Sequence, residues 1–200
     1  MKTKLIITAI LISALLVGYF IYNKTKHSNP NPKYFVGQKL DSLNGVYVFY
    51  NGRVGHTGKR NLSEDGYNIG LEYQCVEFVK RYYYQYYQHK MPDSYGNAKD
   101  FFNDTIADGQ INLQRDLLQY TNPSNTKPMP GDLIIFDGHV SNKYGHVAII
   151  SNVDTNKIEI IQQNPGAFGR SRITISFKKI NNKYQLENDR VLGWLRKQRI

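Results

Sequence analysis

The stretch "YQCVEFVKRYYYQYYQH" at residues 73–89 decides how the rest of the chain is interpreted. Its apolar and aromatic side chains recur at three- and four-residue spacing, which predicts an amphipathic helix. The predicted inner face holds Cys75, Phe78, Val79, Tyr82 and Tyr86. Cys75, the sole cysteine of the chain, lies in the first turn, where free N–H groups and the helix dipole stabilise a thiolate. We therefore expect a lowered pKa for this thiol.

The second half of the chain has the pattern of a β-sheet. Short apolar or alternating runs are separated by turns, which is typical of consecutive antiparallel strands. The predicted strands are 130–136, 145–153, 157–164, 171–180 and 190–197, with an earlier strand at 45–50. Residues 51–70 are expected to form a long loop and residues 98–102 a short second helix. The fold class is therefore α+β, a helix packed against a curled sheet.

The strands supply partners for the cysteine. His146 opens the strand 145–153, and a cysteine nucleophile needs an imidazole to accept its proton and return it to the leaving amine. Gln162 and Asn164 alternate onto one face of the next strand, where either could hold the imidazole in one tautomer. A lone cysteine is otherwise about as often a small buried hydrophobe. The order Cys75, His146 and amide predicts a cysteine amidohydrolase.

Other residues near these segments are candidates for substrate binding: Asn68, Gly70, Gln74, Gly145 and Arg170. Loop structure alone would explain Asn68 and Gly70 equally well, and Arg170 is either solvated or a partner for a substrate carboxylate. His139 has no paired-ligand spacing with Cys75, so no metal site is expected. No organic cofactor is expected either.

The N-terminal segment differs from the rest. Residues 5–22 carry no charge and would reach roughly 27 Å as a helix, close to the thickness of a bilayer core. We predict a membrane anchor or signal segment at 1–22, a polar linker at 23–40 and a catalytic domain at 41–200. Lysines after the apolar run slightly favour a cytoplasmic domain, whereas the short basic N-terminus is typical of export. We favour a single-pass protein with its domain on the periplasmic or extracellular side.

Composition narrows the range of partners. The 200 residues are 40% apolar, enough for one core, and the formal charge is +10. That charge favours anionic partners such as cell-wall polymers or acidic lipid surfaces. The 16 tyrosines are scattered and form no RNA-binding strand motif, so no nucleic acid is expected as a partner.

Five stretches resemble a known family. They are "YQCVEFVKRYY", "PGDLIIF", "GHVAIISNV", "IEIIQQNPG" and "VLGWLR". They are similar to the CHAP family, the cysteine, histidine-dependent amidohydrolases and peptidases, and especially to the amidase domain of glutathionylspermidine synthetase/amidase. The resemblance runs from about Val46 to Arg196. One departure is that Gln162-Gln163-Asn164 stands where the family commonly shows Glu-Gln-Asn, so a neutral amide replaces a carboxylate.

The resemblance implies a papain-like fold, in which the helix carrying Cys75 packs on the antiparallel sheet carrying His146. It implies Cys75 as nucleophile, His146 as general base and acid, and no metal or cofactor. We expect a membrane-anchored hydrolase acting on amide bonds in peptidoglycan or another amide-containing anionic polymer. Two alternatives stay open: a cytosolic amidase acting on glutathionylspermidine-like conjugates, and an inactive wall- or partner-binding module on the same fold.

Overall fold

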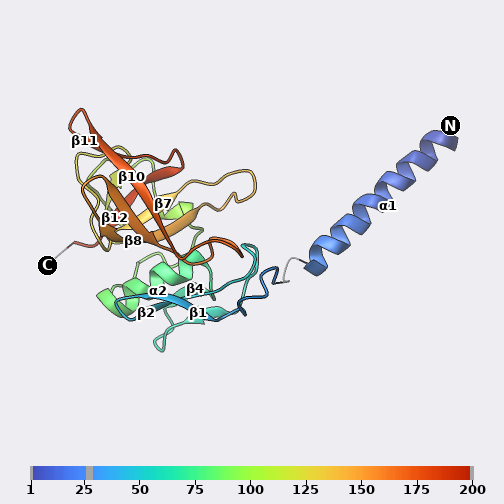
Figure 1. The fold of residues 1–200 in the computed structure, drawn as a ribbon, viewed down its shortest axis with the longest axis horizontal. Helices are drawn as coiled ribbons and strands as arrows, with labels where there is room; N and C mark the ends of the chain where they lie inside the picture. The colour runs from blue at the N-terminus through green and yellow to red at the C-terminus, as the bar shows by residue number, and fades with distance from the viewer. Residues whose placement is uncertain (1, 26–28, 199–200) are drawn as a thin grey trace.

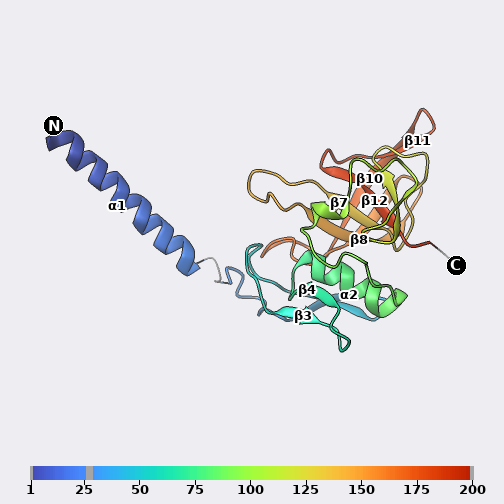
Figure 2. The same ribbon diagram turned by 180° about the vertical axis from the view of Figure 1, so that it is seen from behind.

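The computed structural model describes residues 2–25 and 29–198 (Figure 1). Its first element, α1 (Lys2–Thr25), extends away from everything else in both views (Figures 1 and 2). Within α1, Lys4–Asn23 is long and apolar enough to cross a membrane, and none of it is buried. A signal sequence near an N-terminus has the same length and composition.

The rest of the chain forms a small helical half and a larger sheet half. The first half contains two hairpins and the main helix, and the second half follows a short 3-10 helix. In chain order the elements are β1 (Lys39–Leu43), β2 (Val46–Phe49), β3 (Arg60–Leu62), β4 (Asn68–Leu71), α2 (Cys75–Tyr87), η1 (Lys99–Phe101), β5 (Gln110–Asn112), β6 (Leu117–Thr121), β7 (Leu133–Phe136), β8 (His146–Val153), β9 (Lys157–Ile161), β10 (Arg172–Ile180), β11 (Lys183–Leu186) and β12 (Val191–Arg196).

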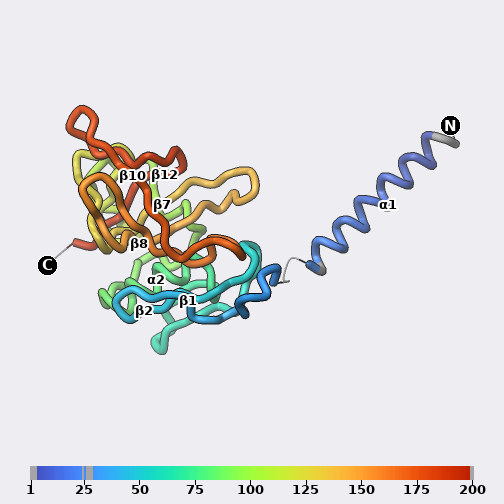
Figure 3. The backbone as a smooth tube through the Cα atoms, viewed as in Figure 1, coloured from blue at the N-terminus to red at the C-terminus, as the bar shows by residue number. Residues whose placement is uncertain are grey.

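The large sheet has the order β11-β10-β9-β8-β7-β12-β6-β5, and every neighbouring pair is antiparallel. Ser124, just after β6, pairs with Tyr184 of the edge strand β11. The sheet therefore curls until β11 lies beside the end of β6, near the opposite edge of the sheet. The tube in Figure 3 follows this curl above α2. The predicted α+β class with a curled antiparallel sheet is confirmed at the level of mixed helix and sheet.

The period-2 alternation of the strands builds two cores. On β7 and β8, Leu133 and Ile149 point towards α2, whereas Ile134 and Ile150 point into the curl of the sheet around Trp194. The α2 core includes Cys75, so the thiol lies at the edge of the packed interior. The helix is thereby fixed against β8.

Two local predictions need correction. Tyr86, predicted to face inward, is half exposed, and Tyr83 is fully buried instead, because the helix presents Phe78, Val79, Tyr82 and Tyr83 to the sheet. Residues 51–70, predicted as a loop, contain β3 and β4. Their short, polar strands lack apolar alternation, so periodicity gives no signal for them.

A buried polar cluster joins α2 to the end of β9. Glu77 and Arg81 form an ion pair with Nε to Oε1 at 2.6 Å, and their side chains are only 3% and 8% exposed. Gln163 Nε2 donates to Glu77 Oε2 at 2.8 Å, and Asn61 Nδ2 donates to Glu77 Oε1 at 3.0 Å. The Arg81 guanidinium also lies over the ring of Phe49. These bonds satisfy both charges inside the protein and hold the helix against the loop after β9.

This cluster predicts a large loss of stability when one charge is removed. Glu77→Ala leaves the Arg81 guanidinium buried without its carboxylate, which costs about 3–5 kcal/mol of the free energy of unfolding. Urea unfolding followed by the fluorescence of Trp194 measures the change. The exposed Glu64→Ala is the matched control and should leave the midpoint nearly unchanged. Equal midpoints for the two variants would contradict the role of the cluster.

Candidate active site

The sequence places Cys75 at the start of α2 through an abrupt change of chain direction. Tyr73 adopts a left-handed conformation with φ of 64°, which turns the chain from β4 into the helix. Gln74 is the N-cap residue and makes no side-chain cap bond to the helix. The first-turn N–H groups of α2 are therefore left to serve the thiol or a ligand.

Cys75 lies beside the strand that begins with His146. Its thiol is within hydrogen-bonding reach of the backbone N–H groups of Val147, of Val76 and of Cys75 itself. Val147 is the residue after His146, the first residue of β8. Helix packing therefore places the thiol next to the residue that follows His146, although 71 positions separate Cys75 and His146 in the sequence.

Gln162 holds the imidazole of His146. Its Oε1 lies 2.9 Å from His146 Nε2, and its own Nε2 donates to the carbonyl of Arg170 at 3.0 Å. Because a carbonyl can only accept, the amide nitrogen must face Arg170 and the amide oxygen must face the imidazole. His146 Nε2 therefore carries the proton, and Nδ1 is the nitrogen with a lone pair available to the thiol.

Asn164, the other amide predicted to orient the histidine, has different partners. Its Nδ2 donates to Val54 O at 3.0 Å and to Gln74 Oε1 at 2.9 Å, and its backbone is left-handed with φ of 58°. β9 ends at Ile161, so the strict strand alternation that would put both amides on one face stops there. Asn164 fastens the loop containing Val54 to the start of α2.

The candidate substrate residues are placed as follows. Asn68 is buried, and its side chain accepts a hydrogen bond from Arg60 and donates one to Ser94 O. Gly70 permits β4 to approach α2, because a Cβ there would lie 3.0 Å from the Cα of Glu77. Gln74 Nε2 donates to Val54 O and to His56 O. Asn68, Gly70 and Gln74 thus support the packing of the segments around Cys75.

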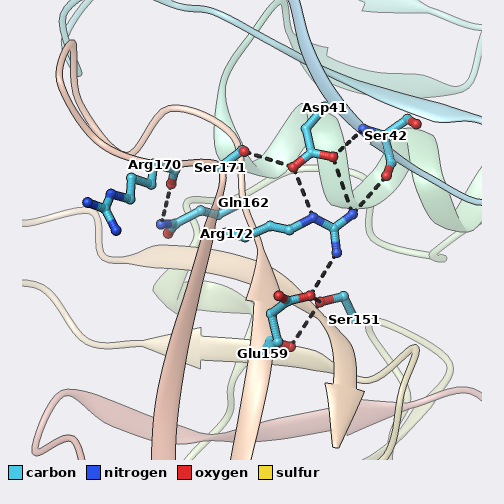
Figure 4. A network of polar contacts seen from close by, with 8 residues as sticks. All are labelled: Asp41, Ser42, Ser151, Glu159, Gln162, Arg170, Ser171 and Arg172. Carbon is cyan, nitrogen blue, oxygen red and sulfur yellow. Dashed lines mark hydrogen bonds and ion pairs between the residues drawn. The ribbon is translucent and has the colours of Figure 1, made fainter.

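Gly145 and Arg170 lie on the histidine side. Gly145 has φ of 74°, and a Cβ there would lie 2.5 Å from the carbonyl oxygen of Phe136, so glycine is required for the turn into β8. Figure 4 shows the Arg170 side chain pointing away from Gln162 while its carbonyl faces the amide. Sequence reasoning considered only the Arg170 guanidinium and missed this role of its backbone.

A surface network fixes the strand that carries Arg170. Arg172 forms ion pairs with Asp41 of β1 at 3.0 Å and with Glu159 of β9 at 2.8 Å, and Ser171 donates to Asp41 at 2.8 Å (Figure 4). Ser171 and Arg172, the two residues after Arg170, are thus bonded to β1 and β9. These bonds hold the carbonyl of Arg170 in the position where it accepts from Gln162.

Burial sets the resting protonation of the pair. It lowers the pKa of His146 from its ordinary value to about 4, against the hydrogen bond that the imidazole donates to Gln162, which raises it, while Arg190 lowers it further. Burial raises the pKa of the Cys75 thiol, against the three N–H groups that lower it. The expected lowered thiol pKa is wrong, because desolvation outweighs the helix terminus. At neutral pH the pair is a thiol and a neutral imidazole.

Two hollows can be compared with this arrangement. A small cavity of about 10 Å³, enough for roughly one water, is lined by Gln162, Asn164 and Tyr50 among others. An open hollow of about 540 Å³ is lined by Tyr87, Met129 and Arg196. Tyr87 is the last residue of α2, so this larger hollow lies at the helix end opposite Cys75.

Comparison with known proteins gives one family. The model described as "CHAP domain" matches residues 64–164, which include the cysteine, the histidine and both amides. The bifunctional glutathionylspermidine synthetase/amidase of Escherichia coli (strain K12) is 33% identical over 111 residues, 52% of this chain and 17% of that protein. The trypanothione synthetase of Crithidia fasciculata is 29% identical over 108 residues, 54% of this chain and 16% of that protein. The chain spans about a sixth of the length of these relatives.

A structural neighbour is also found. The crystal structure of Ly7917 with the hydrolyzing product of MDP is 23% identical, and the match covers 38% of this chain and 30% of that chain with a TM-score of 0.28. A likeness of that size carries no argument about fold or substrate.

The site predicts how a carboxylate would change the histidine. Gln162→Glu places a negative charge against His146 Nε2, which favours imidazolium, so the pKa of His146 should rise from about 4 by one or more units. NMR titration of the imidazole C–H signals measures it. Gln110→Glu, an exposed change on β5, is the control and should leave the histidine pKa unchanged. An unaltered pKa in the Gln162 variant would contradict the assigned contact.

The raised thiol pKa predicts a second measurement. Alkylation of Cys75 by iodoacetamide should be slow at mildly acidic pH and should accelerate only as pH rises past the ordinary thiol range, because the thiolate is the nucleophile. The chain has this single cysteine, so mass spectrometry follows it directly. Fast alkylation below neutral pH would show a thiolate–imidazolium pair instead.

Proposed function

This chain belongs to the CHAP domain family, and from that premise we propose that it is a cysteine hydrolase that cleaves amide bonds of peptidoglycan peptides. The family match supports an amidohydrolase or peptidase. The observation that carries the mechanism is the chain of contacts from the Arg170 carbonyl through Gln162 to His146 Nε2, at the start of the strand whose second residue, Val147, is next to the thiol of Cys75. It leaves Nδ1 as the base.

In the proposed reaction, Nδ1 of His146 takes the thiol proton as the sulfur attacks the carbonyl carbon of the amide. The negative charge that develops on the carbonyl oxygen is held by the backbone N–H of Cys75 at the start of α2. Imidazolium then gives the proton to the leaving amine, and the C–N bond breaks to leave a thioester. Water, deprotonated by the same Nδ1, hydrolyses the thioester and restores the thiol.

Cys75 and His146 are both uncharged before the reaction, and this determines how the activity depends on pH. His146 must be unprotonated to act as the base, so activity is lost as pH falls through its pKa of about 4 and is retained above it. Residue 162 is a glutamine and not a glutamate. No negative charge next to His146 therefore stabilises imidazolium in the first step. The fixed tautomer, rather than charge, is what this amide contributes.

Location and charge support the choice of substrate. We propose that α1 anchors the protein in a membrane, with the catalytic half on the periplasmic or extracellular side, in a papain-like arrangement of helix and sheet. The formal charge of +10 favours an anionic polymer and opposes a cationic polyamine conjugate.

A second candidate has its own observation. The amidase named in the Escherichia coli relative supports hydrolysis of glutathionylspermidine-like conjugates in the cytosol. Full-length protein in detergent, incubated separately with purified peptidoglycan and with glutathionylspermidine, distinguishes the two by mass spectrometry of the products. New peptide termini from peptidoglycan support the first proposal, and release of spermidine alone supports the second. An inactive binding module would yield neither.

The proposed roles predict two different losses. Cys75→Ala should lower kcat at least about a thousand-fold, because the nucleophile is gone. Gln162→Ala should lower kcat by roughly 10- to 100-fold with little change in KM, because the base is present but not held in its tautomer. Steady-state kinetics on the cleaved substrate measures both, with Gln110→Ala as the control. Hydrolysis at the wild-type rate by the Cys75 variant would end the nucleophile proposal.

A further inference from the structure

The segment after α1 is fastened to the catalytic half and does not behave as a free linker. Asn31 Nδ2 donates to Ala167 O at 2.9 Å, and the Tyr50 hydroxyl donates to Asn29 Oδ1 at 2.7 Å. The rings of Tyr34 and Tyr50 also pack with centroids 5.4 Å apart. The chain is therefore attached to the domain from Asn29 onward.

The two loops that receive this segment also border the candidate active site. We call residues 50–56 and 164–170 the mouth loops. Val54 O accepts hydrogen bonds from Asn164 Nδ2 and from Gln74 Nε2, the residue before the cysteine. Ala167, which binds the tethering segment, lies in the loop that begins after Gln162 and ends with Arg170. Figures 1 and 2 show both loops on the side of the catalytic half where α1 is attached.

The tether is short. Only residues 26–28 stand between Thr25, the last residue of α1, and the fastened Asn29. Four steps between consecutive Cα atoms span at most about 15 Å. With α1 in a bilayer, the mouth loops are thus confined to the headgroup region or just beyond it, within roughly one to two Debye lengths of the lipid charges.

The side chains on this face suit a lipid surface. Phe168 on a mouth loop is 75% exposed, and Phe35 on the tethering segment is 69% exposed. Lys33 and Arg170 are exposed beside them. Exposed aromatic rings together with basic residues are the composition of segments that lie at an anionic membrane interface.

We propose that the face formed by the mouth loops and residues 29–35 rests on the anionic headgroups of the bilayer that holds α1. The proposal rests on the proposed membrane anchor and hydrolase activity and deepens both. The enzyme then acts on amide substrates held at the membrane surface, because the loops that contact the start of α2 lie on the face that meets the lipid.

Fluorescence in proteoliposomes tests this contact. The chain has one tryptophan, Trp194, which is fully buried, so a new surface tryptophan reports on its own position. Full-length Phe168→Trp is reconstituted in vesicles of phosphatidylcholine and phosphatidylglycerol, with and without phosphatidylcholine brominated near the headgroup end of its chains. The matched control is Ile180→Trp at the β10–β11 hairpin, which lies on the side away from α1 (Figure 1).

The expected result is that bromolipid removes about half of the added emission at position 168, where an interfacial ring contacts lipid, and leaves that at position 180 unchanged. Equal emission with and without bromolipid at position 168 would overturn the proposal. Tyr22→Trp, near the end of α1 that leads to the catalytic half, reports insertion at the depth of the bromine atoms, and its failure to be quenched would overturn both the anchor and the docked face. Hydrolysis of soluble peptidoglycan fragments by the same variants is measured in parallel, so loss of the catalytic proposal is seen separately.

Discussion

The packing of α2 against the α2-facing side of β7 and β8 is the constraint on which the site depends. Apolar side chains from the helix fill the space over the sheet, and the Glu77–Arg81 pair with Gln163 locks the helix to the loop after β9. Because Gln163 is fixed to the helix, Gln162 beside it is fixed relative to Cys75. The same contact that stabilises the fold therefore sets the separation between Cys75 and Gln162, the residue that contacts the imidazole of His146.

The site combines two opposing electrostatic effects. The start of α2 offers N–H groups and a dipole that favour a thiolate, yet the same packing that builds the core removes water from the sulfur and the imidazole. Desolvation disfavours the charged form of both groups, so the thiol keeps its proton and the imidazole stays neutral. With an amide in place of a carboxylate at position 162, nothing in the immediate contact reverses this balance. In the proposed reaction, charge would separate only as the sulfur attacks, where the N-terminus of α2 can stabilise it.

The arrangement of the loops connects catalysis with location. One loop lies between β2 and β3 and another between β9 and β10, and both contribute bonds to residues beside the cysteine. The segment leading from α1 binds the outer side of these loops. The apolar helix α1 and the start of α2 are thus connected through these loops, and under the proposed anchoring the position of α1 bears directly on which substrates reach the thiol.

The sequence by itself determined the parts of this protein that depend on local periodicity. Helical spacing placed Cys75 at the first turn of α2, alternation placed His146 at the start of β8, and composition marked the apolar N-terminal helix. The polar hairpin β3–β4 was not predicted, because its short strands have no apolar alternation. Only the tertiary structure decided between Gln162 and Asn164, since the strand ends before either amide and the choice depends on the Arg170 carbonyl. It also decided the charge state of the pair, because desolvation depends on how much of the surrounding fold excludes water, and no local pattern records that quantity.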